Sequence, residues 1–300
     1  MIARFSWTIL VDDSAGDSEL PAEHGLSIWI EADGRRILFD TGASDLLLRN
    51  AGGLGIDLRK ADSIVLSHGH YDHTGGLVSV LPLNPAARIF AHPGVIRPRF
   101  SLRPGRPATA VPMPGEAVAK LREESGRVRW VNEPLLFPEG IGLTGPIPRR
   151  TSYEDTGGPF FLDREGRQPD PIEDDLALWF PTKDGLVVVT GCAHSGLVNT
   201  LARIRDLTGG IPFHAILGGF HLGEASPDRL QATCDDLRSF RFNRLIPCHC
   251  TGDGAVARLD AAWPGKVVKG RVGWREGPDR FSSPRRGRRP EHRPRLRRRS

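Results

Sequence analysis

Six consecutive residues near the start of the chain hold three histidines and one aspartate, in the order His-Gly-His-Tyr-Asp-His. They follow directly after residues 63–66, an apolar segment that we expect to form a buried strand. Side chains two positions apart in an extended loop point the same way. The first two histidines can therefore bind one metal ion together, while the aspartate and the last histidine face a second. The candidate ligands are His68, His70, Asp72 and His73.

Glycines accompany this run, at Gly69, Gly75 and Gly76. We expect them to let the backbone turn tightly around the ions, because glycine adopts conformations that other residues avoid. Two cations about 3.5 to 4 Å apart activate a water on one side and stabilise a carbonyl or leaving oxygen on the other. The run therefore indicates a two-metal site suited to hydrolysis.

The rest of the chain predicts strands alternating with short helices. Asp33-Gly34 supplies a tight turn between two β-rich segments, and Lys183-Asp184-Gly185 supplies another. Most strands stop just before a loop rich in glycine or histidine, and loops on rigid strand ends are where sites are usually built. We expect strands at residues 26–31, 36–39, 63–66, 88–91, 176–180, 186–190, 214–217, 244–247 and 266–272, and helices at residues 44–50, 195–207, 227–240 and 255–262.

Two stretches depart from this pattern. Residues 93–171 are rich in proline and glycine among short apolar pieces, and we expect an insertion with some strands, not a separate domain. Residues 278–300 hold ten arginines and almost no apolar side chains. This segment can bury too little apolar surface to offset the entropy lost when its backbone becomes ordered. The sequence thus predicts one domain over residues 1–277 and a disordered, arginine-rich tail.

The formal net charge of +5 would by itself favour an anionic partner such as nucleic acid. The tail, however, carries ten arginines against two acids, so residues 1–277 hold a small excess of acidic residues. We therefore expect a small-molecule substrate, and nucleic acid only through the tail. No apolar run approaches the roughly 18 to 20 residues that cross a membrane, and four cysteines are too few for a disulfide scaffold. These features favour a reducing, cytoplasmic compartment.

Several motifs resemble those of the metallo-β-lactamase superfamily. Phe39-Asp40-Thr41-Gly42 followed by the histidine run is similar to the superfamily's pattern, over most of residues 1–275. Four further segments resemble the 7,8-dihydropterin-6-methyl-4-(β-D-ribofuranosyl)aminobenzene-5′-phosphate synthase-like subfamily, at residues 22–27, 190–196, 217–222 and 247–252. The resemblance implies an α+β fold, a four-layer αββα sandwich with the metal site at the strand ends, here with a Pro/Gly-rich insertion.

The resemblance also implies further ligands. His249 matches the superfamily's last histidine ligand, whereas the usual bridging aspartate is replaced in Thr190-Gly191-Cys192, and one expected histidine is missing. Either Cys192 occupies the bridging position as a thiolate, or His194 supplies the missing ligand. We favour His194, since an imidazole suits zinc, iron or manganese. We expect two divalent metal ions, zinc first, with manganese and iron as alternatives.

Other residues are candidates for supporting or catalytic roles. Asp174 or Asp175 is an additional ligand or holds the tautomer of a histidine, and Asp40 orients the loop at His68. His221 and His24 are candidates for substrate contact or proton transfer beside Asp72, because histidine titrates near neutral pH.

Three functions follow from these residues. The first is a metal-dependent hydrolase that uses a metal-activated water on an ester or phosphoester of a small molecule. The second is the synthase-type transfer that the subfamily name implies, and the third is nucleic-acid processing or binding through the basic tail. The sequence contains no phosphate-binding loop, dinucleotide fingerprint or nucleophile elbow, which argues against those classes of enzyme.

Overall fold

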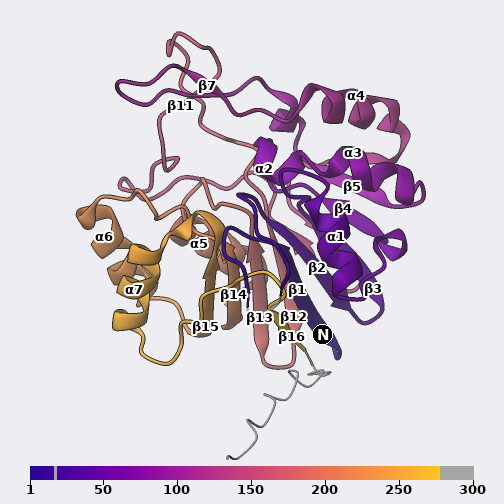
Figure 1. The fold of residues 1–300 in the computed structure, drawn as a ribbon. Coiled ribbons are helices and arrows are strands. Elements are labelled where there is room, and N and C mark those ends of the chain that lie inside the picture. The colour runs from indigo at the N-terminus through magenta and orange to yellow at the C-terminus, as the bar shows by residue number, and fades with distance from the viewer. Residues whose placement is uncertain (17–18, 278–300) are drawn as a thin grey trace, which may run out of the picture.

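The computed structural model describes residues 1–16 and 19–277, so the predicted tail lies outside the described residues. Two β-sheets pack face to face, and helices cover both outer faces (Figure 1). This is the four-layer α+β sandwich that the sequence predicts.

The first sheet has the strand order β16-β1-β2-β3-β4-β5-β8. Strands β1 to β3 pair antiparallel, whereas β3, β4, β5 and β8 run parallel. Strand β4 is buried along its length, as a parallel strand covered on both faces requires, and it leads directly into the histidine run. The strands span β1 Phe5–Val11, β2 Ser27–Ala32, β3 Arg35–Phe39, β4 Ser63–Val65, β5 Arg88–Ala91, β8 Val128–Trp130 and β16 Arg275–Glu276.

The second sheet has the strand order β15-β14-β13-β12-β10-β9. Strands β12 and β13 form the hairpin expected around residues 183–185. Strands β13, β14 and β15 run parallel, so their carboxyl ends at Thr190, Gly219 and Cys248 lie at the same edge. The strands span β9 Leu135–Leu136, β10 Gly142–Leu143, β12 Ala177–Thr182, β13 Gly185–Thr190, β14 Phe213–Gly219 and β15 Phe242–Cys248.

Helices α1, α3 and α4 pack on the first sheet, and α5, α6 and α7 pack on the second (Figure 1). None of the helices in the described ranges is long and apolar enough to cross a membrane. The α-helices span α1 Leu46–Gly53, α2 Tyr71–Thr74, α3 Leu77–Val80, α4 Gly115–Glu123, α5 Leu197–Thr208, α6 Pro227–Leu237 and α7 Asp253–Ala262. Short 3₁₀ helices span Leu58–Lys60, Leu81–Leu83, Pro93–Ile96, Ser125–Arg127 and His249–Thr251.

A third, small sheet stands apart at the top of Figure 1. It pairs β6 Phe100–Ser101 with β7 Thr109–Ala110 and β11 Phe160–Phe161, and we call residues 97–112 and 159–170 the flap. The flap is only part of the range expected to be an insertion. Strands β8, β9 and β10 fall in the same range, yet they extend the two main sheets.

The prediction of a strand at residues 266–272 is wrong. Val267 makes only an isolated bridge to Leu245, so the segment does not pair continuously with β15. The amide of Gly270 still bonds to the carbonyl of Pro247 on β15, but the amide of Gly273 bonds to the carbonyl of Ile9 on β1. The segment therefore crosses from one sheet to the other, which prevents continuous pairing with either, and the final strand is β16.

Phe180 tests the packing between the two sheets. It lies on β12, is fully buried, and its ring contacts that of Phe5 at 4.8 Å between centroids. We expect Phe180→Ala to lower the free energy of unfolding by about 3 to 5 kcal/mol, because it leaves a cavity in a close-packed core. The measurement is urea denaturation. The control Leu136→Ala, at a side chain of 66% exposed surface, should change stability by less than about 0.5 kcal/mol.

Candidate metal centre

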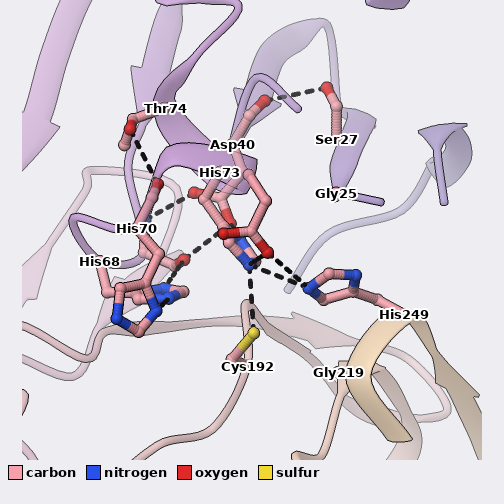
Figure 2. Close-up of polar contacts among 12 residues, drawn as sticks. Gly25, Ser27, Asp40, His68, His70, His73, Thr74, Cys192, Gly219 and His249 are labelled. Atoms are coloured by element: carbon pink, nitrogen blue, oxygen red, sulfur yellow. Dashed lines mark hydrogen bonds and ion pairs between the residues drawn. The ribbon is translucent and has the colours of Figure 1, made fainter. Parts of the chain in front are cut away.

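Loops from both sheets meet at one edge of the sandwich. The loop after β4 carries His68 and His70 and runs into α2. Loops after β13 and β15 bring Cys192, His194 and His249 to the same place. Figure 2 shows His73 between Asp40, Cys192 and His249. Residues from distant parts of the sequence thus form one buried cluster.

Three histidines form the first triad, His68, His70 and His194. The distance from His68 Nε2 to His70 Nδ1 is 2.9 Å, and His194 Nε2 lies 3.2 Å from both atoms. All three residues are buried. Their nitrogen atoms therefore converge on one point, at spacings that suit ligands of a single ion.

Asp72, His73 and His249 form the second triad. His249 Nε2 lies 3.2 Å from His73 Nε2 and 3.2 Å from Asp72 Oδ2, and Asp72 Oδ2 lies 3.6 Å from His73 Nε2. These residues are also buried. The histidine run thus divides between the triads as its spacing predicts, with its first two histidines in one and its last two candidate ligands in the other.

Cys192 lies between the two triads. Its Sγ is 3.1 Å from His73 Nε2, and it lies within 4.8 Å of the ligand atoms of His68 and His194 on one side and of His73 and His249 on the other. The sequence left Cys192 and His194 as alternatives. The structure places both in the cluster, at different positions.

The outer nitrogens of these histidines are held by hydrogen-bond acceptors. Asp40 accepts a hydrogen bond from His73 Nδ1 at 2.7 Å, and it also accepts one from the hydroxyl of Ser67. Because that hydroxyl donates to the carboxylate, it must accept from His68 Nδ1, 2.9 Å away. His194 Nδ1 donates to the carbonyl of Thr156, and His249 Nδ1 donates to Asp13.

This arrangement leaves lone pairs facing one another. His68 and His194 each carry a proton on Nδ1, so neither Nε2 atom has a hydrogen to donate across their 3.2 Å separation. The contact between His68 and His194 is therefore repulsive unless a cation lies between them. In the second triad, burial alone would lower the pKa of His249, but Cys250, Asp13 and Asp72 raise it well above its usual value, so its Nε2 carries a proton toward Asp72. A cation there would take the place of that proton. The donor atoms therefore fit a metal ion in each triad.

Comparisons with known proteins agree with this geometry. Residues 20–202 match the metallo-β-lactamase superfamily. The chain belongs to this superfamily. It is 33% identical to the 7,8-dihydropterin-6-methyl-4-(β-D-ribofuranosyl)-aminobenzene-5′-phosphate synthase of Methanocaldococcus jannaschii, over 81% of this chain and 86% of that protein.

Solved structures show the same fold. Tm1679, described as a metal-dependent hydrolase of the β-lactamase superfamily, is 31% identical and superposes with a TM-score of 0.76, over 91% of this chain and 98% of that one. Zinc-bound PqqB of Methylobacterium extorquens superposes with a TM-score of 0.53 at 14% identity, over 90% of this chain and 99% of that one, a likeness that extends to the fold alone. Members of the superfamily typically bind divalent metals.

Burial sets the charge of the candidate ligands. It lowers the pKa values of His68, His70 and His194 well below the usual value, and the neighbouring histidines lower them further. Burial would by itself raise the pKa of Asp72, but the surrounding histidines lower it below its usual range. Neutral imidazoles beside an ionised carboxylate are the forms that bind a cation, and His249, whose raised pKa keeps it protonated, would lose that proton to bind one.

Asp174 lies behind the first triad, and it does not face the centre. Its Oδ2 accepts from the amide of Gly69 at 2.8 Å and from Arg99 at 2.9 Å, and its Oδ1 accepts from Arg99 as well. The same guanidinium bonds to Asp170 at 2.7 Å, and all three side chains are almost fully buried. Of the two roles expected for Asp174, the structure therefore favours the supporting one.

The glycines of the histidine run act differently from the expectation. Gly69, Gly75 and Gly76 all have ordinary negative φ angles, so no tight left-handed turn requires them. A Cβ at Gly69 would instead collide with the carbonyl of Val95, and one at Gly76 with the carbonyl of Thr41. They are needed because neighbouring backbone packs directly against the loop.

His24 and His221 flank the centre on different sides. His24 donates from Nδ1 to the carboxylate of Asp13 at 2.8 Å, and its Nε2 lies 3.4 Å from Asp72 Oδ2. The ring of His221 lies 4.3 Å from that of His194. Both are more exposed than the six triad residues. They are placed to meet a molecule that approaches the centre.

The sequence missed Asp13, Arg99 and Phe160. Asp13 follows β1, and a pair of acids directly after an apolar strand was the signal that could have revealed it. The ring of Phe160 on the flap lies 4.8 Å from that of His70 and 5.4 Å from that of His194. No local pattern distinguishes Arg99 or Phe160, because their partners lie far along the chain.

We expect Arg99 to stabilise the loop that carries His68 and His70. We expect Arg99→Met to destabilise the protein by about 3 to 5 kcal/mol, because Asp170 and Asp174 would stay buried without their cation. The measurement is chemical denaturation, with metal content measured in parallel. Arg97→Met is the matched control: Arg97 pairs with Glu173 at an exposed position, so its loss should cost less than about 1 kcal/mol. Equal effects of the two changes would contradict this role.

Proposed function

We propose that this protein is a metal-dependent hydrolase that acts on an ester or phosphoester of a small molecule. The observation that carries the proposal is the pair of triads, whose ligand atoms converge on either side of Cys192. The hydrolase Tm1679, at 31% identity over most of both chains, supports it. A phosphorylated substrate is supported by the name of the relative from M. jannaschii, whose product carries a 5′-phosphate.

Each of the two ions would have its own set of ligands. The first ion would be held by His68, His70 and His194, and the second by Asp72, His73 and His249, with the thiolate of Cys192 within reach of both. Two divalent ions supply a water of lowered pKa and a Lewis acid for a substrate oxygen. Zinc is the first choice, because imidazole and thiolate are its preferred donors, with iron or manganese as alternatives.

Residues around the centre would orient the substrate and handle protons. The Nε2 of His24 lies beside Asp72, while Asp13 holds its other nitrogen, so this imidazole can exchange a proton at Nε2. Asp13 raises the pKa of His24, which favours the protonated form that donates to a leaving oxygen. Phe160 provides an apolar wall over His70, which keeps water from one side of the ligands.

A second candidate is the synthase-type transfer named for the relative from M. jannaschii. Its support is the 33% identity over 81% of this chain. The same two-ion site could serve either reaction, because both require an activated oxygen or phosphate group at the centre. The third function, nucleic-acid binding through residues 278–300, remains a prediction, since these residues lie outside the described ranges.

The metal proposal is tested with ligand variants. We expect His68→Ala and His73→Ala each to lose about half of the bound metal, because each belongs to a different triad. Hydrolysis should fall by more than the roughly 10- to 100-fold loss that follows a change behind a ligand. Metal is measured by elemental analysis of protein purified without chelators. His214→Ala, at a half-exposed histidine on β14, is the control and should retain both properties.

The two reactions are separated by substrate. A hydrolase should turn over p-nitrophenyl phosphodiesters or esters, whereas a synthase should form the pterin product without such turnover.

We expect chelation with EDTA to abolish turnover and added zinc to restore it. Removal of residues 278–300 should leave turnover of these small substrates unchanged. Pterin product formation without any ester or phosphodiester turnover would favour the synthase over the hydrolase.

A further inference from the structure

Two of the four cysteines lie against each other at the edge of the metal centre. The Sγ of Cys250 is 3.3 Å from the Sγ of Cys192, and both are free thiols. We propose that Cys192 and Cys250 form a reversible disulfide when the protein meets a peroxide, and that this bond removes Cys192 from the metal centre. The cross-link itself does not depend on the proposed function, but its effect on the metal rests on it.

The fold brings the two sulfurs together through parallel strands. Cys192 follows β13, Cys250 follows β15, and the end of β14 lies between them at Gly219. A Cβ at Gly219 would lie only 2.7 Å from the sulfur of Cys250. Because position 219 lacks a side chain, Cys250 can lean across toward Cys192. A disulfide bond is about 2.05 Å long, so the sulfurs need to approach by only about 1.3 Å more.

Access to solvent distinguishes Cys250 from the other three cysteines. Cys250 is partly exposed, whereas Cys192, Cys234 and Cys248 are buried. Cys248 packs in the core between the sheets, and Cys234 packs between α6 and its sheet. A peroxide therefore reaches Cys250 first, and the nearest thiol to any product there is Cys192.

The chemistry balances with hydrogen peroxide as the oxidant. The thiol of Cys250 and one peroxide molecule give a sulfenic acid and one water. The sulfur of Cys192 then attacks the sulfur of the sulfenic acid, forms the S–S bond and releases a second water. Two thiols are oxidised by two electrons and one peroxide is reduced, and a dithiol reductant reverses the reaction.

The bond has a consequence for the centre because of where Cys192 lies. Its sulfur is 3.1 Å from His73 Nε2 and within reach of both triads. A sulfur in a disulfide is neutral and has moved toward its partner, so it no longer offers a thiolate to either ion. Oxidation should therefore weaken metal binding while the histidines stay in place.

The experiment treats the metal-loaded protein with hydrogen peroxide, blocks the remaining thiols and maps the peptides by mass spectrometry. We expect a cross-link between Cys192 and Cys250, and a fall of more than about tenfold in apparent zinc affinity against a chromogenic chelator. Dithiothreitol should reverse both changes. Cys250→Ser should show no cross-link and keep its zinc after peroxide, and the matched control Cys234→Ala should respond as the wild type does.

The outcomes separate this inference from the proposed function. Oxidation of Cys250 to a sulfinic acid, or a cross-link to any other cysteine, would overturn the disulfide. A cross-link without any change in zinc affinity would overturn its link to the metal. Cys250→Ser protein that is purified with less metal than the wild type would make Cys250 a ligand and overturn it as well. Failure of hydrolysis alone leaves the cross-link intact, because the mapping does not measure activity.

Discussion

The site depends on hydrogen-bond acceptors that lie behind the imidazoles. A neutral histidine has one N–H and one lone pair, so an acceptor on the outer nitrogen forces the lone pair inward. Asp40 does this for His73 directly and for His68 through Ser67, and Asp13 does it for His249. Without these partners the rings could exchange tautomers and bond to one another. With them, the inward nitrogens of His68, His73 and His194 can only accept, and a cation would take the place of the proton that His249 holds toward Asp72.

The sandwich supplies these partners because its parallel strands end at a common edge. The backbone there turns sharply, and four non-glycine residues at the edge have φ angles of 45° to 56°, namely Asp40, Ala193, His221 and His249. Such left-handed conformations cost on the order of 1 kcal/mol or more each for residues with a Cβ. The packed sheets offset that cost, and the result is that the chain can turn a side chain toward the centre immediately after a buried strand.

The sequence predicted the features that depend on a short stretch of chain, and it missed those formed by residues far apart in the sequence. The side chains of the run at residues 68–73 lie in two groups, as their spacing predicts, because that division depends only on a short stretch of backbone. That each group binds an ion stays a prediction. The resemblance to the superfamily indicated His249. It offered Cys192 and His194 as alternatives, since a missing aspartate and a missing histidine cannot be assigned from spacing. Arg99 was missed because the two acids with which it pairs lie more than seventy residues away in the sequence. The segment at residues 266–272 reads as a strand, yet its hydrogen bonds are divided between two sheets.

Charge would allow Cys192 to take the position at which the resemblance to the superfamily implies a bridging aspartate. Two divalent ions would bring four positive charges into a buried site, and buried charge is costly unless it is matched nearby. Asp72 supplies one negative charge at the centre, and Asp13 and Asp40 supply two more through the histidines they hold. Burial raises the pKa of the Cys192 thiol well above its usual value, so Cys192 would supply the fourth charge only when a bound cation takes the place of its proton. Arg99 adds no unbalanced positive charge, because Asp170 and Asp174 already pair with it. A metal-bound thiolate at Cys192 would therefore preserve the charge of an aspartate, while its sulfur would make the centre softer and open to oxidation.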